Sequence, residues 1–180
     1  MDEQLLRSIN AFASVPTIAA LGAALSSRWI LWLTAIPVLA VFSGQRRFVA
    51  IASIVLATGL SEATTSHVIK PLVDRPRPCR ALSGLVTPDG CGPGESFPSG
   101  HAATGFGLAS STASFVPKSA IGLLPLAVFV AASRVLLGVH YPSDVTAGAF
   151  LGAFVGISIG TLGRRLERKK ESRVTERGSS

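Results

Sequence analysis

The sequence predicts an all-α fold, an integral membrane bundle of six transmembrane helices. Charged residues make up only 15% of the 180 residues, whereas about 25% is usual in soluble domains. Residues 8–27, 29–45 and 145–163 contain no Asp, Glu, Lys or Arg, and a helix of roughly 20 apolar residues spans a bilayer. A soluble helical bundle would need charged outer faces on its helices, and these stretches have none.

Three helices are expected in the first part of the chain. The first two, over residues 11–26 and 29–43, fall within the charge-free stretches, and a polar, interfacial lead-in precedes the first. The third is expected over residues 48–70. Pro71 favours ending it at Lys70, because a residue that precedes proline is disfavoured in the helical conformation.

Three further helices are expected after a loop rich in Pro and Gly. The fourth, over residues 101–116, opens directly after a Pro-Ser-Gly turn. The fifth, over residues 119–139, is expected to end near Gly138, since glycine is the usual residue just past a helix end. The sixth covers residues 143–163, and Pro142 suits its first turn.

The chain is expected to form one membrane domain over residues 1–163 and a basic tail over residues 164–180, which we expect to be frayed or disordered. The net charge of +7 gathers in this tail and in connections on the same side, which argues against a nucleic-acid partner. Basic residues favour the cytoplasmic side of a cell membrane. Four polar residues at predicted helix ends then fall on the extracytoplasmic side: Lys70, His101, His140 and Asp144.

Polar side chains are concentrated in three stretches that lie far apart in the sequence, at residues 70–78, 98–101 and 133–144. The first and third contain Lys70, Arg77 and Arg134. Arg77 lies between two prolines, which hold its backbone extended. An unpaired Arg134 inside a membrane helix would be costly. Arg and Lys are the side chains that bind phosphate oxygens, so these cations indicate a phosphate site.

The second stretch forms a turn at the start of an apolar helix. Such a helix end presents free backbone N–H groups and the positive end of the helix dipole, which bind anions. Ser99 can donate from its hydroxyl, and Gly100 allows an oxygen to approach closely. An ordinary helix cap by Ser99 is the alternative interpretation.

Two histidines suit different chemical roles. Asp144 follows His140 by four residues, and a carboxylate bonded to one ring nitrogen makes the other more basic. His140 is therefore a candidate nucleophile toward phosphorus. His101 has no acid at matching spacing, which suits protonation of a leaving oxygen and activation of water. A satisfied interfacial histidine with a capping aspartate is the alternative for His140 and Asp144.

Taken in order, the three stretches resemble the type-2 phosphatidic acid phosphatase family of integral membrane lipid phosphatases. The family pattern is Lys-x6-Arg-Pro, then Pro-Ser-Gly-His, then Ser-Arg-x5-His-x3-Asp, and every fixed position is matched. The resemblance implies a metal-independent phosphatase with a phosphohistidine intermediate and no cofactor. By this likeness His140 is the nucleophile, Asp144 orients it and His101 is the general acid. The phosphate-binding residues would be Lys70, Arg77, Ser99, Gly100 and Arg134.

A metal hydrolase is the nearest chemical alternative. The two histidines and Asp144 are residue types that ligate zinc. The same site is rich in cations, which repel a divalent metal and suit a phosphate. We therefore predict no metal.

Cys79 and Cys91 are the only cysteines of the chain. Both lie in the loop between the third and fourth predicted helices, on the outer face, where an oxidising compartment permits a disulfide. We predict that they are bonded. The bond would make the loop that carries Arg77 more rigid.

Three other polar residues are not fixed positions of this pattern: Glu62, Asp74 and Arg75. Glu62 lies about two turns before Lys70 on the same helical face. It either tunes Lys70, binds another helix or makes a buried hydrogen bond. Asp74 and Arg75 are expected to form a local, solvated pair.

These observations together predict a phosphatase that acts on a lipid phosphate at the outer surface of the membrane. Undecaprenyl diphosphate is the leading expected substrate, and phosphatidylglycerophosphate and phosphatidic acid are its rivals. Transfer of the phosphoryl group to an acceptor other than water remains an alternative, as does a lipid-binding or transport protein without turnover. A transporter is expected to show repeats or broken helices at the membrane midplane.

Overall fold

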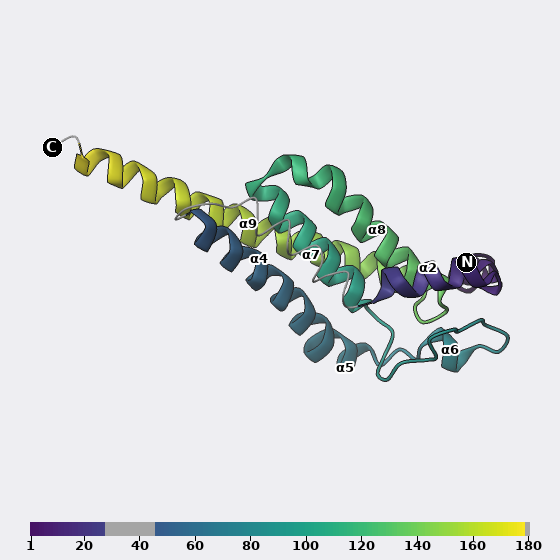
Figure 1. The fold of residues 1–180 in the computed structure, drawn as a ribbon. Helices are drawn as coiled ribbons and strands as arrows, with labels where there is room; N and C mark the ends of the chain where they lie inside the picture. The colour runs from purple at the N-terminus through teal and green to yellow at the C-terminus, as the bar shows by residue number, and fades with distance from the viewer. Residues whose placement is uncertain (28–45, 179–180) are drawn as a thin grey trace.

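The computed structural model describes residues 1–27 and 46–178, and the predicted helix over residues 29–43 lies outside these ranges. Within them the chain forms helices and loops and no β-strand (Figure 1). The elements in order are α1 (Asp2–Asn10), η1 (Ala11–Ser14), α2 (Pro16–Ser26), α4 (Arg46–Ala63), η2 (Thr64–Ile69), α5 (Lys70–Val73), α6 (Pro78–Ala81), α7 (Gly100–Phe115), η3 (Pro117–Ser119), α8 (Ala120–Leu136) and α9 (Pro142–Gly178).

Three helical segments of the described chain are long and apolar enough to cross a membrane: Phe48–Ala81, Pro117–Leu136 and Pro142–Lys169. The N-terminal helices add a fourth if their bent pair counts as one span. The chain is thus a multi-pass membrane protein with three or four candidate spans in the described ranges. Helix α7 has 16 residues, about 24 Å of helix, and most of its side chains are buried at the centre of the bundle.

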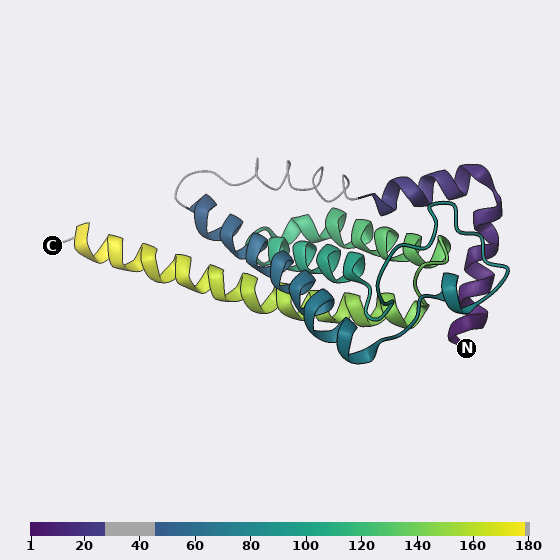
Figure 2. The same cartoon turned by 90° about the horizontal axis from the view of Figure 1, so that it is seen from below.

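The predicted first helix is broken near its start. Val15 is extended, with φ −86° and ψ 115°, and Pro16 opens α2. Proline lacks an N–H and disfavours a helical residue before it, so the two N-terminal segments meet at 112°. As a result α1, with η1, lies across one end of the bundle (Figure 2). Leu6 and Asn10 are buried there.

The third predicted helix does not end at Lys70. Residues Thr64–Ile69 form a π-helix and the chain continues as α5 to Val73. Pro71 lies in the first turn of α5, a position at which the missing N–H of proline is tolerated. The π-helix just before it replaces the regular hydrogen bonds of an α-helix, so the chain stays helical through Pro71. The helix ends at Asp74, which has φ 47°.

The sixth predicted helix starts where expected but extends much further. Gly138 has φ 68° after the end of α8, and Pro142 is the first residue of α9. Helix α9 continues for 37 residues to Gly178, so the expectation of a frayed or disordered tail is wrong. Its sequence is rich in Arg, Lys, Glu and Leu, which are strong helix formers. The C-terminus lies at the end of the bundle opposite α1 (Figures 1 and 2).

Contacts across the segment between α5 and α7 hold its two arms together. The structure pairs Cys79 with Cys91 in a disulfide with a Cα–Cα distance of 5.7 Å, within the usual range. The N–H of Ser96 donates to the carbonyl oxygen of Arg75 at 2.8 Å. Asn10 of α1 donates to the carbonyl oxygen of Val86 at 2.8 Å and accepts from its N–H at 2.9 Å. The loop is therefore anchored at several points close to the predicted phosphate-binding stretches.

Helices α7 and α9 approach each other closely through small residues. A methyl group built at Gly152 of α9 would overlap the carbonyl of Ala103 in α7, and one at Gly156 would overlap the carbonyl of Gly107. Small residues allow such backbone approach in membrane helices. The packing sets the N-terminus of α7 beside the first turn of α9.

Replacing Gly152 by Ala should lower the free energy of unfolding by about 1–3 kcal/mol, the usual cost of overpacking, because the overlap is with backbone and no side-chain rotation relieves it. Thermal unfolding of the purified protein in detergent measures the effect. Gly59→Ala in α4 is the matched control, since its added methyl group meets no described atom within 4 Å. Equal melting temperatures for the two variants would contradict the packing argument.

Candidate active site

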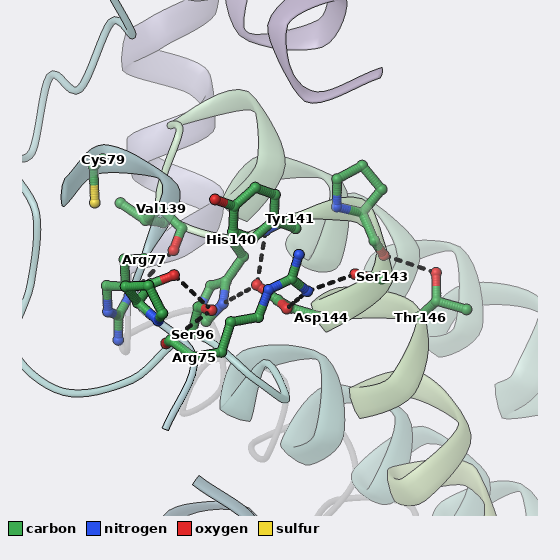
Figure 3. A network of polar contacts seen from close by, with 12 residues as sticks. Arg75, Arg77, Cys79, Ser96, Val139, His140, Tyr141, Ser143, Asp144 and Thr146 are labelled. Atoms are coloured by element: carbon green, nitrogen blue, oxygen red, sulfur yellow. Dashed lines mark hydrogen bonds and ion pairs between the residues drawn. The ribbon is translucent and has the colours of Figure 1, made fainter. Parts of the chain in front are cut away.

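The three predicted stretches meet at the end of the bundle where α1 lies. The N–H of Ser99 donates to the carbonyl oxygen of Asp144 at 2.9 Å, which joins the second stretch to the third. Arg77 is 7% exposed. It donates to the carbonyl oxygen of Gly94 at 3.2 Å and to that of Val139 at 3.5 Å (Figure 3). The first stretch thus touches the third as well.

His140 and Asp144 face each other across the first turn of α9 (Figure 3). The His140 ring is 2% exposed and its Nδ1 lies 3.5 Å from Oδ2 of Asp144, which is longer than a normal hydrogen bond. Among the described residues Nδ1 has no hydrogen-bond partner. Oδ2 accepts a hydrogen bond from the N–H of Tyr141 at 2.8 Å. Because Nδ1 faces the carboxylate, Nε2 is the nitrogen left for chemistry.

The surroundings of His140 keep its imidazole neutral. Burial, with a further contribution from the charges of Arg77 and Arg134, lowers the pKa of His140 to about 4 against the opposing effect of Asp144. At neutral pH the ring therefore retains a lone pair on a ring nitrogen. A nucleophile needs that lone pair.

Cations gather around the two histidines. The charges of Arg77 and Arg134 both act on Lys70, on His101 and on His140. Like charges repel at this range, so their assembly in one half-buried region is unfavourable without an anion. A phosphate is the anion whose geometry suits guanidinium groups.

Besides Nδ1 of His140, two buried polar atoms at the site have no hydrogen-bond partner in the described part of the chain: Oγ of Ser99 and Nε of Arg134. Ser99 is the N-cap of α7, yet its side chain makes no capping hydrogen bond. The alternative of an ordinary helix cap is therefore not what the structure shows. Unpaired buried polar groups are costly, and both of these are donors that a phosphate oxygen satisfies.

Glu62 also belongs to this region. Its Oε1 accepts a hydrogen bond from Oγ of Ser66 at 2.8 Å, and its charge acts on Lys70. The carboxylate lies against Gly100, where a built methyl group would be 3.0 Å from Oε2. The bond to Ser66 is exposed, so the alternative of a buried hydrogen bond is wrong, whereas the charge of Glu62 does act on Lys70.

Ser26 at the end of α2 is a contact that the sequence did not indicate. Its carbonyl oxygen lies 3.1 Å from Nε2 of His101, and since a carbonyl only accepts, Nε2 carries the proton. Its hydroxyl accepts a hydrogen bond from Arg134. Ser26 precedes His101 by 75 positions, and its contact with His101 uses a backbone oxygen, so no residue pattern marks it.

Arg75 does not form the expected solvated pair with Asp74, and that prediction is wrong. Its NH1 donates to Oδ1 of Asp144 at 2.7 Å (Figure 3), and its NH2 donates to Oδ2 of Asp2 at 2.9 Å. One signal pointed to this: Arg75 and Arg77 each precede a proline, which favours an extended backbone, and alternate residues of extended chain share a side. Both side chains reach the third stretch.

The sequence matches known proteins over part of its length. The chain is 40% identical over 108 residues to the decaprenylphosphoryl-5-phosphoribose phosphatase of Mycobacterium tuberculosis, covering 58% of this chain and 56% of that protein. It is 38% identical over 63 residues to the lipid A 1-phosphatase of Rhizobium johnstonii, covering 35% of this chain and 26% of that protein. The chain thus spans about half the length, or less, of these curated relatives.

Two solved membrane proteins share the fold, and a family model covers the site. The crystal structure of Aquifex aeolicus LpxE matches with a TM-score of 0.63 and 28% identity, covering 91% of this chain and 94% of that chain. A transmembrane PAP2-type phosphatidylglycerolphosphate phosphatase from Bacillus subtilis matches with a TM-score of 0.54 and 19% identity, covering 90% and 94%. The model of the PAP2 superfamily matches residues 47–167, a range that holds all three polar stretches, and the chain therefore belongs to the PAP2 superfamily.

Proposed function

We propose that this chain is a metal-independent membrane lipid phosphatase that hydrolyses a phosphate or diphosphate headgroup through a phosphohistidine intermediate. The observation that carries the proposal is the group of unpaired donors and cations beside a neutral, buried histidine. Oγ of Ser99 and Nε of Arg134 have no partner in the described ranges, and Arg77 and Lys70 add charge. A bound phosphate would satisfy these donors and neutralise the cations.

In the first step, Nε2 of His140 attacks phosphorus and the bond from phosphorus to the leaving oxygen breaks. His101, protonated once the bound phosphate offsets the surrounding cations, donates a proton to that oxygen, so that the lipid leaves as an alcohol, or as a monophosphate when the substrate is a diphosphate. Asp144, 3.5 Å from Nδ1, stabilises the positive ring that forms. The cations hold the phosphate oxygens, whose charge the attack redistributes.

In the second step, water attacks the phosphorus of phosphohistidine. His101, now neutral, accepts a proton from the water, the N–P bond breaks, and its electron pair returns to Nε2 of His140. Inorganic phosphate leaves. Since Nε2 of His101 donates to the carbonyl oxygen of Ser26, Nδ1 is the nitrogen that exchanges the proton in both steps.

The arrangement of the site within the bundle supports an extracytoplasmic active site and a cytoplasmic C-terminus. The site and the C-terminus lie at opposite ends of the bundle (Figure 2), and the basic residues near the C-terminus favour the cytoplasm. The six-helix arrangement remains part of this proposal, with residues 1–163 as the membrane domain and residues 164–180 as the basic tail.

For the substrate we propose an isoprenoid lipid, with undecaprenyl diphosphate first. The relative from Mycobacterium tuberculosis is named for a decaprenyl lipid phosphate, which favours an isoprenoid chain over an acyl chain. Phosphatidylglycerophosphate and phosphatidic acid present the same terminal phosphate to the same cations and are the rivals.

Purified full-length protein should release inorganic phosphate from at least one member of a lipid panel. The panel contains undecaprenyl diphosphate, decaprenylphosphoryl-5-phosphoribose, phosphatidylglycerophosphate, phosphatidic acid and lipid A. The His140→Ala variant should lose activity by a factor on the order of 10⁴ or more, as when other catalytic nucleophiles are removed. His67→Ala is the matched control, because His67 is exposed and outside the proposed mechanism. Full activity in His140→Ala would remove the mechanism, and no release from any lipid would remove the phosphatase proposal.

Chelation should leave the rate unchanged, because the proposed site holds phosphate with Lys70, Arg77 and Arg134 and uses no Lewis acid. Phosphate release is measured before and after dialysis against EDTA. A loss of activity that added Mg²⁺ or Zn²⁺ restores would establish a metal hydrolase instead.

A further inference from the structure

We propose that Arg75 is a positioning residue for phosphoryl transfer, and that Asp2 of α1 holds Arg75 in place for this role. The inference rests on the proposed function and deepens it. Neither residue is a fixed position of the pattern that the three stretches match. The two link α1, at the end of the bundle, to the carboxylate that faces His140.

The first link fixes the orientation of the Asp144 carboxylate. Its side chain is fully buried, and its two oxygens have separate partners. Oδ1 accepts from NH1 of Arg75 at 2.7 Å. Oδ2 accepts from the N–H of Tyr141 at 2.8 Å and faces Nδ1 of His140 at 3.5 Å. Removing the guanidinium would leave a buried charge uncompensated and free one oxygen, so the carboxylate could turn away from the ring.

The second link fixes Arg75 itself. NH2 donates to Oδ2 of Asp2 at 2.9 Å, and NH1 also donates to Oγ of Ser143 at 2.8 Å. The guanidinium carbon lies 3.9 Å from the centre of the Tyr141 ring, a favourable cation–π distance. The planar fork of arginine spans two carboxylates at once, which the single ammonium of lysine cannot do.

Asp2 is held independently on the first turn of α9. Its Oδ1 accepts from the N–H of Ser143 at 3.0 Å, and its Oδ2 accepts from the hydroxyl of Ser143 at 2.5 Å. A carboxylate is favoured at a helix N-terminus. Asp2 is therefore a fixed anchor, and Arg75 connects it to Asp144 (Figure 3 shows Arg75 with Ser143 and Asp144).

A purely structural role, in which these contacts only pin α1 to the bundle, makes different predictions. In that case, loss of the contacts lowers stability and reduces the amount of folded enzyme. Loss of positioning slows the chemical step in enzyme that is folded, so kcat falls while KM changes little. Phosphate binding itself uses the cations of the site, which these two residues do not replace.

The test uses the full-length protein, with kcat and KM for the best lipid of the panel, and thermal unfolding for each variant. Arg75→Gln should lower kcat by up to about 100-fold, the effect of a small misplacement of catalytic groups, and slow phosphohistidine formation in acid-quench measurements. Arg75→Lys should be similarly impaired. Asp2→Asn should lower kcat less, and the Asp2→Asn/Arg75→Gln double variant should match Arg75→Gln alone, because the two residues act through one contact.

Two controls match the variants closely. Arg80→Gln removes a cation from the same loop, where Arg80 donates to the carbonyl oxygen of Gly92 at 2.5 Å. Glu3→Gln removes a carboxylate from the same turn of α1, where Glu3 pairs with Arg7 at 2.9 Å. Both should retain the wild-type kcat.

Unchanged kcat in folded Arg75→Gln, or full activity in Arg75→Lys, would overturn this inference while leaving the phosphatase intact. Additive effects in the double variant would overturn the role of Asp2. If Arg75→Gln fails to fold, the comparison of Asp2→Asn with Glu3→Gln carries the same test. An inactive wild-type protein on the whole panel would overturn the proposed function, and this inference with it.

Discussion

The close backbone contact between α7 and α9 is the constraint on which the candidate site depends. A methyl group at Gly148 would overlap the carbonyl oxygen of Ser99, and the N–H of Ser99 bonds to the carbonyl oxygen of Asp144 at 2.9 Å. In a bilayer, apolar side chains gain little by leaving the lipid, so close packing of small residues holds helices together. That packing brings the turn of α7 and the His140–Asp144 pair into one small region.

Helix ends set by local chemistry were predictable from the sequence, and those set by competing effects were not. Gly138 and Pro142 act on their own backbone, and α8 and α9 end and begin beside them. Pro16 acts locally too, but the apolar stretch around it concealed the break between η1 and α2. Pro71 is tolerated because the π-helix before it changes the hydrogen bonding, and residue types alone do not reveal such an adjustment.

For the site, the sequence identified residues whose type and spacing carry chemistry, and it missed residues whose role depends on contacts between distant elements. His140 and Asp144 are four positions apart, so the short path from the bend at His140 into the first turn of α9 brings them together. Ser26 reaches His101 through a carbonyl oxygen that every residue has, and Asp2 reaches Arg75 across 73 positions. The cations lie close together although their charges repel one another. Folded proteins accept such local costs at functional sites.

Helix α9 joins the buried carboxylate of Asp144 to the far end of the molecule in one uninterrupted rod of 37 residues, about 55 Å long. The hydrocarbon layer of a typical bilayer is only about 30 Å thick. The part of α9 without charged residues, 145–163, is about 28 Å long and matches this layer, so the charged remainder of the rod extends beyond the hydrocarbon. Because Asp144 directly precedes the charge-free part, the length of that part sets the depth of the carboxylate relative to the lipid headgroups.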